Sequence, residues 1–215
     1  MDYFSMLPVV KTWFVIPRYV LNYGSMTMPN RADARTLLTA HVHDAYQQFH
    51  ATMVGAVMAG YAATFGEDVE LFWTTGYLHD IDYEQHPNEH PGPSLEWFTE
   101  WEYPTELIHA VEAHADGFNG FTTKPETLLA RTLLACDEIC GLIYAYQKLN
   151  PIPFSDIKVS SIKKRFNEPK FAPGINREHI QKAVEGLSIT LDEHITNILS
   201  FLAGLENPLL TSAHE

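Results

Sequence analysis

The sequence has little cysteine. Its 215 residues include only two cysteines, Cys136 and Cys140, which lie four residues apart in what we expect to be one helix. That spacing suits two reduced thiols in a core better than a structural disulfide. Disulfide-stabilised secreted scaffolds are therefore disfavoured, and the reducing cytoplasm is the expected compartment.

Positive charge is also scarce. The chain carries 14 Lys and Arg against 27 Asp and Glu, which gives a formal net charge of −13. A surface with this balance repels polyanions over most of its area. We therefore expect no nucleic acid polymer as a partner.

The N-terminus lacks an apolar run long enough for a signal core or a membrane span. Residues 1–24 are rich in apolar side chains, but Lys11 and Arg18 leave only six uncharged residues between them. Asp2 stands where a signal peptide carries positive charge. A membrane span needs about 20 apolar residues. We expect residues 1–34 to form an ordered arm on the domain, and we expect no membrane partner.

No stretch shows the sustained alternation that is typical of strands. Apolar residues recur instead at helical spacing, as at positions 129, 133, 136, 140 and 143. Thr190 and Glu193 have the spacing of a capping box that opens the last helix. We predict an all-α chain, subdivided near residue 150, with one or two helices over 31–65 and further helices over 69–81, 94–101, 105–115, 126–149, 155–165 and 177–187.

Histidine, in contrast, is abundant. There are 11 histidines, and eight of them lie between positions 41 and 114. His79 and Asp80 are adjacent at the end of an apolar helix, where both can turn toward one cation. His50 lies at the edge of a strongly apolar helix, and His114 continues the inward face of another. For His50, the alternative of a hydrogen-bonded core histidine stays open.

Asp137 is an acidic residue in the middle of the long expected helix, beside Leu133 and Leu134. Gly141 stands four residues later, so the helix itself offers no cation at that position. A carboxylate drawn toward a core must be paired, protonated or bound to metal, because burying an uncompensated charge is costly. Glu138 has a similar setting, and one of the two acids is free to face water.

The order of these residues resembles the H…HD…D signature of the HD-domain superfamily of metal-dependent phosphohydrolases, with the two further histidines of its two-metal members. The resemblance covers roughly residues 35–150. It implies an HD-domain helical bundle over 35–150 and a C-terminal helical extension over 151–215 that packs on the same domain. It is carried by Gly76-Tyr77-Leu78-His79-Asp80, His90-Pro91, Ala113-His114-Ala115 and Ala135-Cys136-Asp137-Glu138.

The resemblance also implies a set of metal ligands. One metal would be held by His50, His79, Asp80 and Asp137. A second metal would be held by His90 and His114, with Asp80 bridging the two metals. His86-Pro87 repeats the His90-Pro91 step, so His86 stays an alternative to His90. Imidazole and carboxylate ligands suit Fe, Mn, Co, Ni or Zn, whereas a structural zinc site would use cysteine.

The sequence departs from the family pattern in two places. The common HDIG form reads His79-Asp80-Ile81-Asp82 here, so Asp82 replaces glycine. Ala113 stands where cyclic dinucleotide phosphodiesterases have the first of two histidines, which disfavours that activity. Asp82 is here a candidate acid or base behind the metal ligands. We expect Asp80 to position the cations and Asp82 or Glu138 to transfer protons.

Basic residues gather in one part of this acidic chain. From position 148 to position 182 there are eight Lys and Arg against three Asp and Glu, a local balance of +5. A solvated helix face explains such a cluster without any function, and this alternative stays open. The functional alternative is that Lys163, Lys164 or Arg165 reaches over the metal pocket and holds a phosphate or carboxylate.

Together these observations predict a cytoplasmic, metal-dependent phosphohydrolase that acts on a small anionic substrate, a phosphate ester or nucleotide, with a metal-activated water. The resemblance also embraces di-iron oxygenases such as myo-inositol oxygenase, and ligand identity does not separate the two chemistries. A non-catalytic binding protein is disfavoured, because a decayed site is expected to lose ligands. No glycine-rich phosphate loop, Ser-His pair or reactive cysteine arrangement competes.

Overall fold

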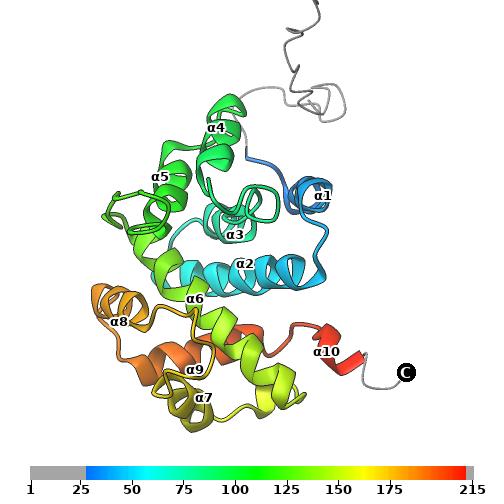
Figure 1. Cartoon of the computed structure of the whole chain (residues 1–215), viewed down its shortest axis with the longest axis vertical. Coiled ribbons are helices and arrows are strands. Elements are labelled where there is room, and N and C mark those ends of the chain that lie inside the picture. Colours follow the sequence, from blue (N-terminus) through cyan, green and yellow to red (C-terminus); the bar gives the residue numbers. More distant parts are fainter. Residues whose placement is uncertain (1–27, 212–215) are drawn as a thin grey trace, which may run out of the picture.

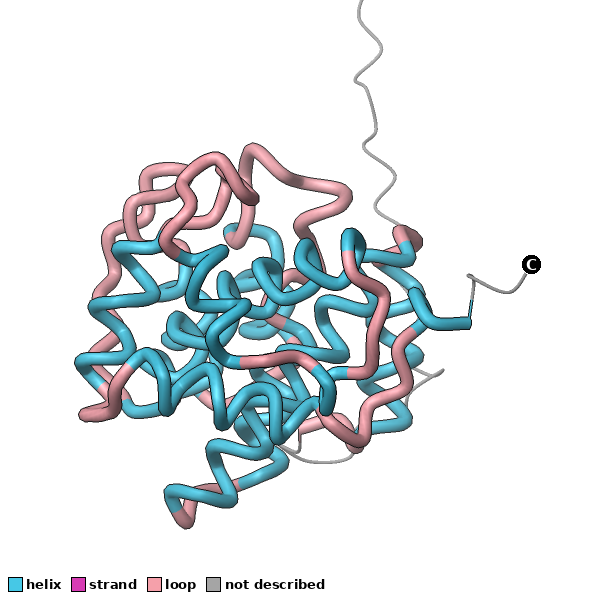
Figure 2. The backbone as a smooth tube through the Cα atoms, turned by 90° about the horizontal axis from the view of Figure 1, so that it is seen from below, coloured by secondary structure: helices cyan, strands magenta, loops and turns pink. Residues whose placement is uncertain are grey.

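The computed structural model describes residues 28–211, and these form helices and loops without a strand (Figure 1). Figure 2 shows the same from a second direction. The all-α prediction is therefore confirmed. Residues 1–27, most of the expected N-terminal arm, lie outside the described residues. The elements are α1 (Arg31–His41), α2 (Ala45–Phe65), α3 (Val69–Leu78), α4 (Gly92–Glu100), α5 (Thr105–His114), α6 (Leu128–Leu149), the 3-10 helix η1 (Phe154–Asp156), α7 (Val159–Phe166), α8 (Arg177–Gly186), α9 (Leu191–Leu202) and α10 (Pro208–Thr211).

Short polar side chains cap the starts of several helices. Asp44, Asp68 and Thr127 accept hydrogen bonds from backbone N–H groups in the first turns of α2, α3 and α6. These bonds satisfy donors that a helix leaves free at its start. Thr190 and Glu193 form the expected capping box at the start of α9, so that prediction is confirmed. None of the described helices is long and apolar enough to cross a membrane.

Several helix boundaries differ from the sequence prediction, and the two largest differences lie at the end of α3 and in the region 155–165. α3 ends at Leu78 rather than at residue 81, because the chain tightens there into turns such as the one closed by the bond from Ile81 N–H to the Leu78 carbonyl. The helix expected over 155–165 is divided into η1 and α7, because Ile157 is extended and its side chain is buried. The region 31–65, for which one or two helices were predicted, forms the two helices α1 and α2. They are separated because the backbone of Val42 is extended.

α2 is the central helix, and α3 lies closely against it (Figure 1). Gly76 permits this approach: a Cβ atom at residue 76 would lie 2.6 Å from Met58 Cγ and 3.0 Å from the carbonyl oxygen of Val54. Met58 and Val54 are fully buried. The close packing of α3 on α2 therefore fixes the end of α3, where His79 and Asp80 follow.

The segment after residue 150 packs against α6 and α2. His194 on α9 is fully buried, with one ring nitrogen 2.6 Å from the Tyr61 hydroxyl of α2 and the other 2.8 Å from the Ala135 carbonyl oxygen of α6. α8 lies along α6, and the N–H of Asn176 at its start donates to the carboxylate of Glu138 at 3.2 Å. One buried core thus continues across residue 150, and the expected domain boundary there stays a prediction.

Candidate metal centre

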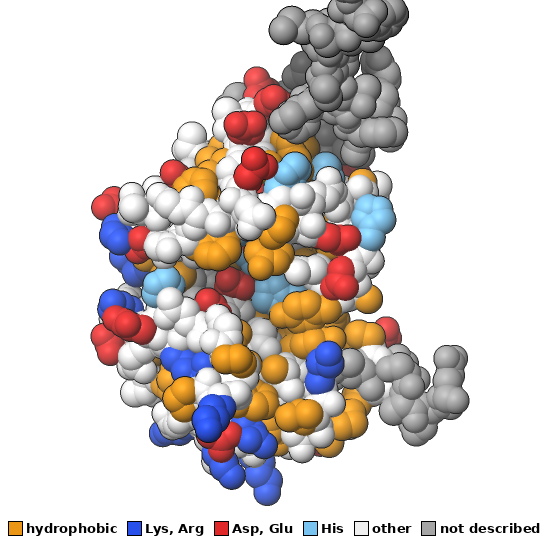
Figure 3. Space-filling view, viewed as in Figure 1, with side chains coloured by type: hydrophobic (Ala, Val, Ile, Leu, Met, Phe, Trp, Pro, Cys, Tyr) orange, Lys and Arg blue, Asp and Glu red, His pale blue; other side chains and the backbone are white. Residues whose placement is uncertain are grey.

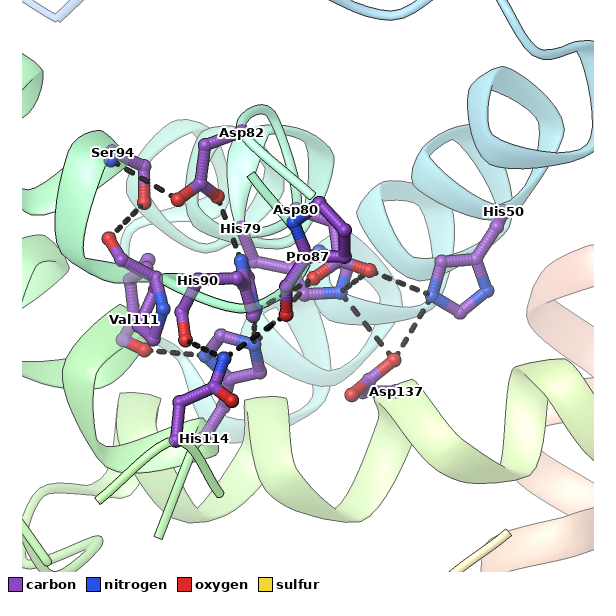
Figure 4. A network of polar contacts seen from close by, with 12 residues as sticks. His50, His79, Asp80, Asp82, Pro87, His90, Ser94, Val111, His114 and Asp137 are labelled. Carbon is purple, nitrogen blue, oxygen red and sulfur yellow. Dashed lines mark hydrogen bonds and ion pairs between the residues drawn. The ribbon is translucent and has the colours of Figure 1, made fainter. Parts of the chain in front are cut away.

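Six histidine and aspartate side chains from separate parts of the chain meet at one place (Figure 4). They come from α2, the end of α3, the loop before α4, the end of α5 and the middle of α6. These are the residues for which the sequence predicts a ligand role, and the structure brings all of them together. In chain order they are His50, His79, Asp80, His90, His114 and Asp137.

The six residues form two groups that share Asp80. Within each group, one potential ligand atom per residue lies within 4.8 Å of the others. Asp80 Oδ2 is 3.3 Å from His79 Nε2, and Asp80 Oδ1 is 3.3 Å from His90 Nε2. The two oxygens thus face different groups, as in a carboxylate that bridges two cations. The first group is His50, His79, Asp80 and Asp137, and the second is Asp80, His90 and His114.

Backbone carbonyls fix the orientation of two of these histidine rings. The Nδ1 atom of His79 lies 2.8 Å from the carbonyl oxygen of Gly76, and Nδ1 of His114 contacts that of Val111. A carbonyl oxygen only accepts, so each Nδ1 carries a proton and donates it. Nε2 of His79 is then left buried without a hydrogen-bond partner among the described residues. Such convergent imidazole and carboxylate groups fit a divalent transition metal.

Asp82 orients His90 and does not face the cavity. Its carboxylate is fully buried and accepts hydrogen bonds from His90 Nδ1–H at 2.7 Å and from the N–H of Ser94 at 3.3 Å. A carboxylate behind a ligating histidine fixes the direction of the ring. Direct proton transfer between Asp82 and a substrate, one of the predicted roles, therefore does not fit its position.

His86, the sequence alternative to His90, lies outside both groups. Its Nδ1 atom is 3.3 Å from the Glu89 carboxylate, and its ring lies edge-on to Trp97. The structure therefore favours His90 as the potential ligand.

The carboxylates and histidines of the site shift one another's pKa values. Burial by itself lowers the pKa of His79, but Asp80 and Asp137 outweigh it, and the pKa is raised. Burial raises the pKa of Asp80, and the facing His79 and His114 more than reverse this and hold it well below its usual range. Asp137 is affected in the same way: burial raises its pKa, and His50 and His79 bring it below the ordinary value. The pocket therefore favours ionised carboxylates next to positive charge, which a cation can supply in place of ring protons.

Both groups open into a cavity of about 520 Å³. This volume is typical of sites for small molecules. Figure 3 shows acidic and histidine side chains in the hollow between the two halves of the molecule. The remaining walls include Tyr46, Tyr83, Phe118, Glu138, Asn176 and His179.

Glu138 lines this cavity from α6. Burial, together with the adjacent Asp137 carboxylate, raises the pKa of Glu138 to about 7. The hydrogen bond from the Asn176 N–H acts in the opposite direction without reversing the shift. Of the two residues predicted to transfer protons, Glu138 is the one within reach of a molecule in the cavity.

The structure does not bring the predicted substrate-binding residues of α7 to the site. α7 buries its apolar face against the core, so Lys163 and Lys164 are exposed on the opposite side. Lys163 pairs with Asp192 at 2.7 Å, and Arg165 pairs with Glu168. None of the three lines the cavity. The prediction that Lys163, Lys164 or Arg165 holds the substrate is therefore not supported.

Sequence reasoning missed several side chains of the cavity wall. Asn176 carried only the signal of a helix cap, and His179 lies outside the histidine-rich region. Both reach the cavity because α8 packs along α6, which no local pattern encodes. Tyr46 had a readable signal, since it precedes His50 by four residues and so shares its helix face.

Comparison with known proteins identifies this part of the chain. The family model of the HD domain matches residues 49–141, a range that contains all six residues of the two groups. Comparison with curated proteins and with solved structures finds no match. HD domains bind divalent metals, and the His/Asp cluster here can hold one. Residues 49–141 are therefore identified as an HD domain.

Proposed function

We propose that this protein is a metal-dependent phosphohydrolase that cleaves a small phosphate ester or nucleotide. The observation that carries the proposal is the position of Asp80, which presents one carboxylate oxygen to each of two ligand groups beside a cavity of about 520 Å³. Divalent cations bound there supply Lewis-acid activation of water and neutralise charge on phosphoryl oxygens.

The residues of the chain have separate roles in this proposal. His50, His79 and Asp137 hold one cation together with Asp80, and His90 and His114 hold the other. Asp82 acts through His90 as a positioning residue, because it contacts the ring and not the cavity. Its buried hydrogen bond keeps the ring from turning away from Asp80.

Glu138 is the proposed proton-transferring group. It lines the same cavity as Asp80 and Asp137, and its carboxylate is held at one oxygen by the N–H of Asn176, 3.2 Å away. A general acid or base must lie within hydrogen-bond reach of the substrate, and the position of Glu138 in the cavity wall supports this role.

Aromatic side chains suit the organic part of the substrate. Tyr46 and Phe118 both line the cavity, and they are among the most exposed large apolar residues of the described chain, at 37% and 46%. Exposed aromatic rings at a cavity offer a surface for apolar contact.

The free, buried thiols of Cys136 and Cys140 support a reducing compartment, and we place the protein in the cytoplasm.

The proposal is tested by turnover of a panel of phosphate monoesters and nucleotides by metal-loaded protein. We expect phosphate release that requires metal and proceeds equally with and without oxygen. A panel without any phosphate release would contradict the proposal. Turnover that requires oxygen would instead assign the site to oxygenase chemistry.

A further inference from the structure

A second, smaller pocket of about 290 Å³ adjoins the metal cavity. Asp116 and His179 line both, so the two spaces meet at these residues. The smaller pocket lies between the loop after α5, the first turns of α6 and α8. Its remaining walls come from Lys124, Pro125, Arg131, Leu134, Lys182 and Ala183.

The two spaces differ in charge. Among residues 28–211, no lysine or arginine lines the metal cavity, whereas Asp80, Asp116, Asp137 and Glu138 do. The smaller pocket has three permanent cations and one carboxylate. Figure 3 shows basic side chains at the left edge of the molecule, where the loop after α5 faces α8. A substrate that spans both spaces therefore meets protein cations only in the smaller one.

The acids close to this pocket do not neutralise all of its cations. Lys124 Nζ lies 2.7 Å from both oxygens of Asp116, and Lys182 Nζ lies 2.7 Å from Glu178. Arg131 makes no ion pair within the part of the chain that the structure describes. Of the three cations that line the pocket, Arg131 is thus the one without an ion pair among the described residues.

Arg131 also has unused hydrogen-bonding capacity. Its Nη1 group donates to the Glu126 carbonyl oxygen at 3.0 Å, and its Nε atom is buried without a hydrogen-bond partner among the described residues. A buried donor without an acceptor is costly. A guanidinium group suits phosphate and carboxylate, since it offers paired donors to their oxygens.

We infer that this pocket binds a second anionic group of the substrate, a phosphate or a carboxylate, while the first phosphate lies at the metal cavity. The inference rests on the proposed function and narrows it to small substrates with two anionic groups. Arg131 is the central contact, and Lys124 and Lys182 provide the surrounding positive charge.

Matched substrates test this inference. Metal-loaded full-length protein is assayed on linear alkanediol bisphosphates of increasing chain length, on the corresponding monophosphates and on phospho-carboxylates of the same lengths. For at least one length we expect kcat/KM to favour the doubly anionic ester by about tenfold or more over the monophosphate. This exceeds the factor of about two that a bisphosphate gains from its two equivalent ends.

Arg131→Met removes the charge and keeps the aliphatic stem that packs near Gly186. We expect it to abolish the preference for doubly anionic esters and to leave kcat/KM for monophosphates within about twofold, because only the remote anion loses its contact. Lys182→Met, at an exposed side chain, provides a second variant without risk to the core. Lys170→Met, an exposed lysine that lies outside both pockets, is the matched control and retains the preference.

Sulfate binding, measured by titration calorimetry on the same metal-loaded proteins, separates this inference from the proposed function because it needs no turnover. Because the metal cavity can also take sulfate, we expect two sulfate sites in the wild type. Arg131→Met should weaken one of them by about tenfold, and Lys170→Met should leave both unchanged. Arg131-dependent sulfate binding without hydrolysis of any ester would support the pocket and contradict the phosphohydrolase. Equal sulfate affinity in wild type and Arg131→Met, together with an unchanged ester preference, would overturn the pocket.

Discussion

His79, His90 and His114 each donate Nδ1–H to an acceptor outside the site and turn Nε2 toward Asp80. The resemblance to the HD-domain superfamily, together with residue types that bind transition metals, predicted which side chains meet. They were not enough to predict how the rings are held, since two of the acceptors are backbone carbonyls. The predicted proton-transfer role of Asp82 failed for the same reason: the sequence shows an acid near the site but not the ring it faces.

Replacement of Asp80 by Ala is expected to remove most of the bound metal, because this is the carboxylate shared by both groups. Glu138→Gln is the matched control: it changes a neighbouring carboxylate of the same cavity that belongs to neither group, so metal is retained while kcat falls. Elemental analysis of both variants after identical purification measures the difference. Full metal content in Asp80→Ala would rule out the bridging role.

Replacement of Asp82 by Asn is expected to weaken the second metal site by about 10–100-fold, as found for residues that orient a ligating histidine. The first site, which does not include His90, keeps its affinity. Metal titration of wild type and variant separates the two sites. Equal affinity at both sites would show that His90 does not need Asp82 to hold its orientation.

At the scale of helices, periodicity and caps were sufficient to predict most elements, including the capping box of α9. The C-terminal end of α3 and the division of the 155–165 region were not predicted, because buried side chains and tight turns decide them rather than local propensity. The same limit applies to Lys163, Lys164 and Arg165. Their charge was evident in the sequence, but the buried face of α7 decides the direction in which they point.

Gly76→Ala tests the packing of α3 on α2. The added methyl group would lie 3.0 Å from the carbonyl oxygen of Val54 and closer still to Met58, and overpacking of this kind costs about 1–3 kcal/mol. Gly141→Ala is the matched control, because its nearest neighbour is the flexible Cδ1 atom of Ile175 at 3.2 Å. We expect that variant to be unchanged or stabilised by up to about 1 kcal/mol through helix propensity. Unfolding in denaturant measures the free energy of unfolding of both variants. A Gly76→Ala variant as stable as the wild type would contradict the close packing of α3 on α2.

His194 makes the attachment of α9 depend on pH. Burial lowers the pKa of His194 to about 4, below the usual 6.5. Between these values the unfolded chain binds the extra proton, so this residue's contribution to stability is complete above pH 6.5 and is lost as the pH falls toward 4. The loss amounts to about 3 kcal/mol.

Unfolding free energies of wild type and His194→Gln, measured at pH 7 and pH 4, test this contribution. The advantage of the wild type over the variant should shrink by about 3 kcal/mol at the lower pH. A difference that stays constant between the two pH values would show that His194 is not held neutral by burial.

At the scale of the whole molecule, packing brings together charges that are far apart in the sequence. Arg131 and Lys182 line one pocket because α8 lies along α6, and Lys124 reaches it from the loop between α5 and α6. The sequence shows an excess of basic residues after position 148, but only the fold shows which of them adjoin the metal cavity. The acidic metal cavity and the smaller basic pocket therefore lie side by side because of the packing of the helices, and not because their residues are close in the sequence.

The most direct test of the two-metal site is the metal content of full-length protein purified without added metal and then loaded to saturation. Elemental analysis should give about two transition-metal ions per chain, and the double variant His90→Ala, His114→Ala should give about one, because its first group is intact. Metal content that never exceeds one ion per chain in the wild type, or that is unchanged in the double variant, would contradict the account.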